Sequence, residues 1–171
     1  LSPPDDYTRV LIGEHELNAR TLAMLEHAQI LYGGNHDLVR ALTQGSYNIG
    51  VSASFGTHDA GGAIDLSLRD LANWHNVLTG EAPAIIDALR RAGFAAWIRE
   101  QDELYSGSPV HIHAIAIGDV ELSPAAQEQL TGPAGYFRGF NGLPVDPPTP
   151  DTYGGPILCP WMAMEGYSLL Y

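Results

Sequence analysis

In two short segments of this chain polar and apolar side chains alternate along part of the segment, and these segments constrain the fold more than any other feature. Residues 63–68 read Ala-Ile-Asp-Leu-Ser-Leu, and residues 111–117 read His-Ile-His-Ala-Ile-Ala-Ile. A period of two is typical of β-strands, in which successive side chains point to opposite faces of a sheet. The pattern therefore predicts two strands, one with Asp65 and the other with both His111 and His113 on a single face.

Other patterns predict helices and further strands around these two segments. Apolar residues recur near helical spacing in the first predicted helix, and Gly33-Gly34 then ends it. Ser123 and Pro124 form an N-cap and first-turn pair that begins the last helix. We expect helices at 14–31, 70–78, 83–91 and 124–130, and strands at 39–43, 63–68, 94–100 and 111–117. This order predicts an α+β fold with a small, mostly antiparallel sheet flanked by helices.

The length of 171 residues fits one domain with a sizeable core. The composition changes after Gly132, where Pro and Gly become frequent and no convincing periodicity is left. We expect residues 1–131 to form the domain that carries the chemistry. Residues 132–171 are expected to form an irregular C-terminal extension, packed on that domain or part of a subunit contact; the oligomeric state stays open.

The charge and the single cysteine restrict the partners and ligands of this chain. Twenty acidic residues against eight Lys and Arg give a formal charge of −12, which disfavours a phosphate backbone, so we expect no nucleic-acid partner. No apolar run approaches the roughly 20 residues that span a bilayer, so we expect no membrane span. Cys159 is the only cysteine, which excludes an internal disulfide and a thiolate cluster and leaves His and carboxylate as metal ligands.

The predicted strands and the loop before the first of them suggest such a metal site. A pair of glycines between His58 and Asp65 lets the chain turn sharply, so that imidazole and carboxylate can meet at one cation. The second strand adds His111 and His113 on one face. Two neutral imidazoles and one carboxylate, with one position open, form the ligand set of a catalytic zinc site. The alternative is a solvated Asp65 beside half-buried histidines, although unpaired polar groups are costly on an otherwise apolar strand.

The spacing of the first group resembles a known family. His58-x-x-Gly61-x-Ala63-x-Asp65 matches the His-x-x-Gly-x-Ala-x-Asp motif of the zinc D,D-peptidases. That family includes D-alanyl-D-alanine carboxypeptidases, dipeptidases and phage L-alanyl-D-glutamate endopeptidases, and it shares its fold with the signalling domain of hedgehog proteins. The resemblance thus implies a hedgehog/D,D-peptidase-like fold.

Further segments carry the same resemblance. Ala-Gly-Phe at 92–94 and His-Ile-His at 111–113 are similar to the second motif region of hedgehog-type chains. The sequence also looks like actinobacterial cell-wall proteins with Gly-Thr-His-Asp-x-Gly-Gly-Ala-x-Asp and His-Ile-His-Ala-x-Ala-Ile-Gly-Asp. The resemblance covers about residues 14–130 and leaves the C-terminal extension unmatched.

The resemblance implies one Zn²⁺ ion bound by His58, Asp65 and His113, and hydrolysis of peptide bonds by metal-activated water. The substrate would be a peptidoglycan stem peptide or a similar peptide, cut by a carboxypeptidase or an endopeptidase. It also implies a secreted protein that acts at the cell wall. The sequence begins with Leu1 and shows no signal peptide, so we expect a mature or trimmed form.

The general base is where the sequence departs from the family. Many members carry a Glu three residues before the last His ligand, where this chain has Val110. His111 is the first candidate in its place, since some members use a His. Glu100 is the second, at the distance from Phe94 where hedgehog-type chains place a Glu, and Glu103 is a third. Any of them must come within about 3 Å of the reacting water.

The second departure concerns the substrate. Carboxypeptidases of this family usually carry an Arg that holds the terminal carboxylate, and the matching stretch 44–48 has none. This absence favours an endopeptidase or another peptide specificity. A hypothesis from a different class also stays open: a zinc-binding module of the same fold, weakly active or inactive, that serves wall or protein recognition.

Overall fold

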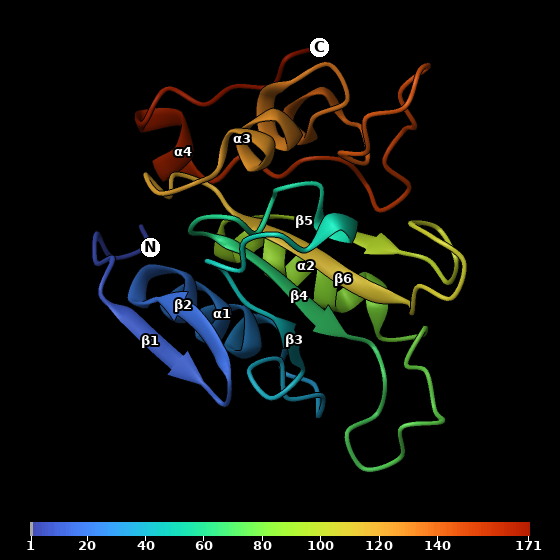
Figure 1. Cartoon of the computed structure of the whole chain (residues 1–171). Coiled ribbons are helices and arrows are strands. Elements are labelled where there is room, and N and C mark those ends of the chain that lie inside the picture. The colour runs from blue at the N-terminus through green and yellow to red at the C-terminus, as the bar shows by residue number, and fades with distance from the viewer. Residues whose placement is uncertain (1) are drawn as a thin grey trace.

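The computed structural model describes residues 2–171 and shows an α+β fold with two small antiparallel sheets and four α-helices (Figure 1). The larger sheet has the strand order β3-β4-β6-β5, so that β4 and β6 are its central strands. The predicted fold class is therefore confirmed. The strands are β1 (Arg9–Ile12), β2 (His15–Asn18), β3 (Leu42–Gln44), β4 (Ala63–Ser67), β5 (Phe94–Arg99) and β6 (His111–Ala116).

The register of the larger sheet places polar residues in two adjacent rows. In the first row Asp65 pairs with His113, which pairs on its other side with Trp97. In the next row Ser67 pairs with His111, which pairs with Arg99. Paired residues of neighbouring strands lie about 5 Å apart and on the same face, so both rows project from one side of the sheet.

The helices begin and end where local chemistry stops the chain. The Asn18 side chain accepts a hydrogen bond from the Thr21 backbone N–H at the start of α1, and the Ser123 side chain does the same for Ala126 at the start of α3. Gly33 ends α1 in a left-handed conformation. The helices are α1 (Ala19–Tyr32), α2 (Ala82–Ala92), α3 (Pro124–Thr131) and α4 (Pro160–Met164), with single 3₁₀ turns at Ser52–Ser54 and Tyr136–Arg138.

The two faces of the larger sheet have different covers. Ile64 and Ile112 point to the face that packs against α1 and α2 in the main core. Ala63, Trp97 and Ile115 point to the opposite face, which packs against α3 and the C-terminal extension (Figure 1). The Asp65–His113 row lies on this second face, so the extension lies on the same side of the sheet as the predicted metal site.

Two expected helices are wrong in part or in full. The helix expected at 14–31 begins only at Ala19, because the preceding residues form β2, which pairs with β1 in a hairpin. No helix forms at 70–78. There the Asp70 and Asn73 side chains accept hydrogen bonds from backbone N–H groups two residues ahead and stabilise turns instead.

The C-terminal extension is fastened to the domain by a buried arginine. Arg90 in α2 forms a 2.6 Å ion pair with Asp151 and donates hydrogen bonds to the carbonyls of Tyr153 and Gly155. The Trp97 indole N–H donates to the carbonyl of Phe140 at 3.0 Å.

Within residues 2–171, no helix combines the length and the apolar character that crossing a membrane requires.

Candidate metal centre

Three elements bring His58, Asp65 and His113 together. Asp65 lies in the middle of β4, His113 lies directly opposite in β6, and His58 comes from the loop before β4. Gly62 lets this loop turn back, because its φ of +78° suits glycine and a Cβ there would meet the Leu122 side chain at 2.5 Å. The glycine pair noted in the sequence thus has the predicted role.

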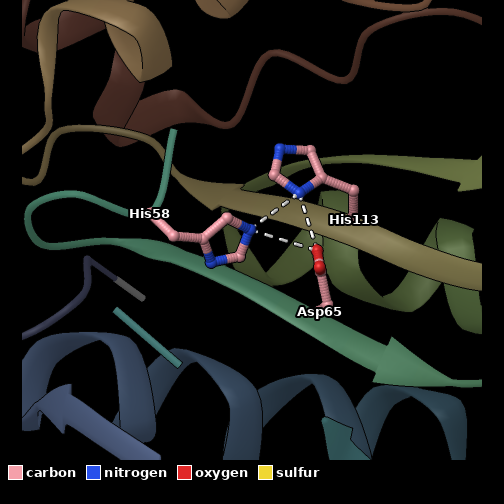
Figure 2. A group of neighbouring side chains, drawn as sticks. All are labelled: His58, Asp65 and His113. Atoms are coloured by element: carbon pink, nitrogen blue, oxygen red, sulfur yellow. Dashed lines mark hydrogen bonds and ion pairs between the residues drawn. The ribbon is translucent and has the colours of Figure 1, made fainter. Parts of the chain in front are cut away.

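The three side chains point at one another (Figure 2). The distance from His113 Nδ1 to Asp65 Oδ1 is 2.8 Å, and His58 Nε2 lies 3.3 Å from each of these two atoms. One ligand atom from each residue lies within 4.8 Å of the others, so this group can hold a metal ion. His58 and His113 are only 1% and 5% exposed, which keeps competing water away from them.

The outer nitrogen of each imidazole faces a hydrogen-bond acceptor. His58 Nδ1 lies 2.8 Å from the carbonyl oxygen of Gly45, and His113 Nε2 lies 3.0 Å from Oε1 of Gln129 in α3. A carbonyl oxygen can only accept, so each outer nitrogen carries the ring proton when a metal takes the inner one. The inner nitrogens, His58 Nε2 and His113 Nδ1, then present lone pairs toward Asp65. Acceptors of this kind are the usual supports of metal-binding histidines.

Burial and neighbouring charges set the protonation of the three groups. Burial opposes ionisation of Asp65, but the His58 charge and hydrogen bonds from both histidines outweigh it and hold the pKa of Asp65 far below its usual range. Burial alone would lower the pKa of His58, yet the Asp65 carboxylate and the Gly45 carbonyl raise it. Burial lowers the pKa of His113 to about 4, so this imidazole is neutral near pH 7.

The donor set fits a small divalent cation. Zinc–nitrogen and zinc–oxygen bonds of about 2.0–2.2 Å in a tetrahedron separate ligand atoms by about 3.3–3.6 Å, and both 3.3 Å distances from His58 Nε2 fall at the lower end of this range. Without a metal, one hydrogen-bond acceptor beside His113 is left without a donor from this ring. Neutral His113 has one ring proton but faces two acceptors, Asp65 Oδ1 and Gln129 Oε1. A cation at Nδ1 removes the conflict, because the proton then serves Gln129.

The group lies in the wall of a pocket with a cavity volume of about 190 Å³. Three large aromatic side chains line it from three different loops, and Phe55, Trp74 and Tyr105 are each more than half exposed. Asp65 is the only carboxylate among the lining residues, whereas two arginines, Arg69 and Arg99, take part in the wall. The pocket therefore combines an apolar rim with a polar floor that holds the candidate metal ligands.

The structure separates the candidates for the general base. His111 lines the pocket, and its Nε2 lies 3.8 Å from Asp65 Oδ2. Its Nδ1 lies 2.8 Å from the carbonyl oxygen of Pro109 and must donate there, which leaves Nε2 as the free acceptor of the neutral ring. Glu100 and Glu103 are exposed, lie outside the pocket lining, and bond to each other through the Glu100 N–H and the Glu103 carboxylate.

Sequence reasoning missed two residues of this site. Gln129 in α3 and Arg99 in β5 reach it through tertiary packing. The alternation of β5 could have signalled Arg99, because it shares a face with Trp97. No local pattern indicates that Gln129 faces a histidine sixteen residues away.

Comparison of the chain with protein-family models, with curated proteins and with solved structures found no match. The resemblance to zinc D,D-peptidases therefore depends on the motif residues alone.

Proposed function

We propose that this chain is a zinc-dependent peptidase that hydrolyses peptide bonds in peptidoglycan stem peptides or similar peptides. The observation that carries the proposal is the convergence of His58, Asp65 and His113 in the wall of an open pocket. Two imidazoles and one carboxylate suit zinc among the common divalent ions. From the resemblance of the motif residues to zinc D,D-peptidases and cell-wall proteins, we also propose that the protein is secreted and acts at the cell wall.

The chain's own residues would position the ion and leave it accessible. The acceptors at Gly45 and Gln129 orient the two imidazoles, so the inner nitrogens need no rearrangement to bind. Among the lining residues Asp65 supplies the only negative charge, which would leave a divalent ion with net positive charge at the pocket floor. A zinc ion held there supplies Lewis acidity, which polarises a carbonyl and makes water easier to deprotonate.

His111 is the residue that we assign to proton transfer. Its Nδ1–H is fixed on the Pro109 carbonyl, so Nε2 can take a proton from water at the site and later give it to the leaving amine. The 3.8 Å between Nε2 and Asp65 Oδ2 places this nitrogen beside the ligand group. The exposed aromatic side chains at the rim offer apolar contacts to a peptide that lies across the pocket.

One observation favours the second candidate, a zinc-binding recognition module. Among the pocket-lining residues no carboxylate other than Asp65 is present to serve as a base, and Asp65 is itself a ligand candidate. If His111 does not transfer protons, the same pocket would bind a peptide without cutting it. The two candidates make opposite predictions for catalysis and the same prediction for metal binding.

Zinc-loaded protein incubated with purified peptidoglycan, followed by mass analysis of the released fragments, separates the two. We expect new peptide fragments, and a His111→Gln variant that still binds zinc should release them roughly 10²–10⁴ times more slowly. His75→Gln is the matched control, because His75 is exposed and lies outside the pocket lining. No fragments from wild type beside an active control enzyme would refute the peptidase and support the module.

A further inference from the structure

Arg99 is a buried cation with an incomplete set of partners. Only 2% of the residue is exposed. Its Nη1 donates one hydrogen bond, at 2.9 Å, to the carbonyl of Asn141, whereas Nη2 has no partner within residues 2–171. None of the ion pairs in this part of the chain includes Arg99. Leaving a buried charged donor unpaired is costly, so this arrangement needs a reason.

Arg90 shows what a structural arginine looks like in this molecule. It is 1% exposed, pairs with the Asp151 carboxylate, and directs its remaining donors at carbonyl oxygens of Ala96, Tyr153 and Gly155. Its role is complete without any ligand. Arg99 has a comparable burial and its guanidinium carbon lies 5.4 Å from the centre of the Trp97 ring, but it makes only one hydrogen bond and its Nη2 donors have no acceptor.

The position of Arg99 connects it to the metal centre. It pairs with His111 across the sheet, one row from His113, and it takes part in the wall of the same pocket. Burial lowers the pKa of Arg99 itself only to about 10, so the guanidinium stays protonated at neutral pH.

The charges in the pocket favour an anionic ligand. Two neutral imidazoles and one carboxylate leave a divalent ion with one excess positive charge, and Arg99 adds a second. Asp65, the only carboxylate in the lining, is already committed to the ligand group. The net charge in the pocket would thus be positive, opposite in sign to the net charge of −12 of the whole chain.

We propose that Arg99 binds a carboxylate of the peptide in this pocket and so determines which peptides are accepted. A guanidinium offers a carboxylate parallel N–H groups from two of its nitrogens, and Nη2 can supply one of them without giving up an existing hydrogen bond. Because little of Arg99 is exposed, the guanidinium must turn slightly toward the pocket, and one hydrogen bond to Asn141 opposes this turn. The inference rests on the proposed function for the ligand being a peptide. The carboxylate has two sources, the peptide C-terminus or an acidic side chain.

The test uses short peptides and the whole chain. The probes are N-acetyl-alanyl-alanine with a free carboxylate, its C-terminal amide, and N-acetyl-glutamyl-alanine amide, each in all-L and all-D forms. Binding is measured by calorimetry on metal-free protein, where neither hydrolysis nor zinc coordination contributes, and again on zinc-loaded protein. We expect one of the two charged probes to bind about 10-fold to 100-fold more tightly than the neutral amide. The preferred charged probe identifies the source of the carboxylate.

Two variants connect that preference to Arg99. Arg99→Gln should abolish it, and Arg99→Lys should restore only part of it, because lysine keeps the charge but not the planar fork. Arg69→Gln is the matched control, since it removes a positive charge from the same pocket wall, where Arg69 already donates to the Trp74 carbonyl. If the control loses the preference equally, general electrostatics explains it and the proposal is wrong.

Equal binding of charged and neutral probes to wild type also overturns the proposal, whether or not Arg99→Gln folds. The failure of this proposal and the failure of the proposed peptidase activity can be distinguished. Hydrolysis of peptidoglycan without a carboxylate preference would remove the role of Arg99 and keep the peptidase. A preference that depends on Arg99 in a protein that releases no fragments would keep the binding site and remove the peptidase.

Discussion

Replacing Gln129 with methionine tests the geometry of the metal centre without touching a ligand. The side chain is 9% exposed and its Oε1 faces His113 Nε2 at 3.0 Å. Methionine has a similar length and packs well, but it does not accept this hydrogen bond strongly. We expect Gln129→Met to bind zinc about 10-fold to 100-fold more weakly than wild type, a difference of about 1.4–2.7 kcal/mol.

The structure also indicates which state of the protein bears this cost. Without metal, the single ring proton of His113 can move to Nδ1 and donate to Asp65, which lies 2.8 Å away. With metal at Nδ1 the proton must stay on Nε2, and a buried N–H without a partner costs about 1–3 kcal/mol. The penalty should therefore appear in zinc affinity and hardly at all in the stability of the metal-free protein.

Competition with a chromophoric zinc chelator at neutral pH measures the affinity, and urea unfolding of the metal-free protein measures the stability. Gln127→Met is the matched control, because Gln127 is exposed on the same helix and should change neither quantity. The reasoning is refuted if Gln129→Met keeps wild-type affinity. It is equally refuted if both variants weaken zinc binding to the same extent.

Three further predictions concern the ligands and the fold. His113→Ala should abolish stoichiometric zinc in elemental analysis, whereas His75→Ala should retain it. Burial lowers the pKa of His113 from 6.5 to about 4, so between these pH values its imidazole is protonated in the unfolded chain and neutral in the folded protein. The unfolding free energy of the metal-free protein should therefore fall by up to about 3 kcal/mol across this interval, and His113→Gln should flatten that slope. Asp151→Asn should cost about 3–5 kcal/mol in urea unfolding, because it leaves buried Arg90 unpaired; Asp87→Asn, in an exposed ion pair, should cost less than about 1 kcal/mol.

The central strands and two of the helices could be predicted because their signals are local. The alternation in β4 and β6 is strong enough to place Asp65 and His113 on one face. The N-cap residue Ser123 correctly predicts that α3 begins at Pro124. The glycine pair allowed His58 to approach Asp65, and the resemblance to the zinc D,D-peptidases implied that both join His113 in one ligand set.

The remaining features depend on tertiary context. Leu17 fits the apolar spacing of the predicted helix, but pairing with β1 makes residues 15–18 a strand. In residues 70–78 short polar side chains accept hydrogen bonds from nearby backbone N–H groups and stabilise turns in place of a helix. The spacing of apolar residues does not show that these side chains compete with the helix for the backbone. Gln129 approaches His113 because α3 packs over β6, a contact that no spacing along the chain encodes.

The C-terminal extension is part of the site even though no motif includes it. The Trp97 ring stacks on His113 with ring centres 6.1 Å apart, and the Phe140 carbonyl holds its indole N–H. The Asn141 carbonyl holds Arg99 in the same way. Two neighbouring carbonyls of the extension thus fix one side chain beside a candidate metal ligand, His113, and one in the wall of the pocket. A division of the chain at residue 132 therefore describes its composition, whereas the chemistry of the pocket depends on both parts.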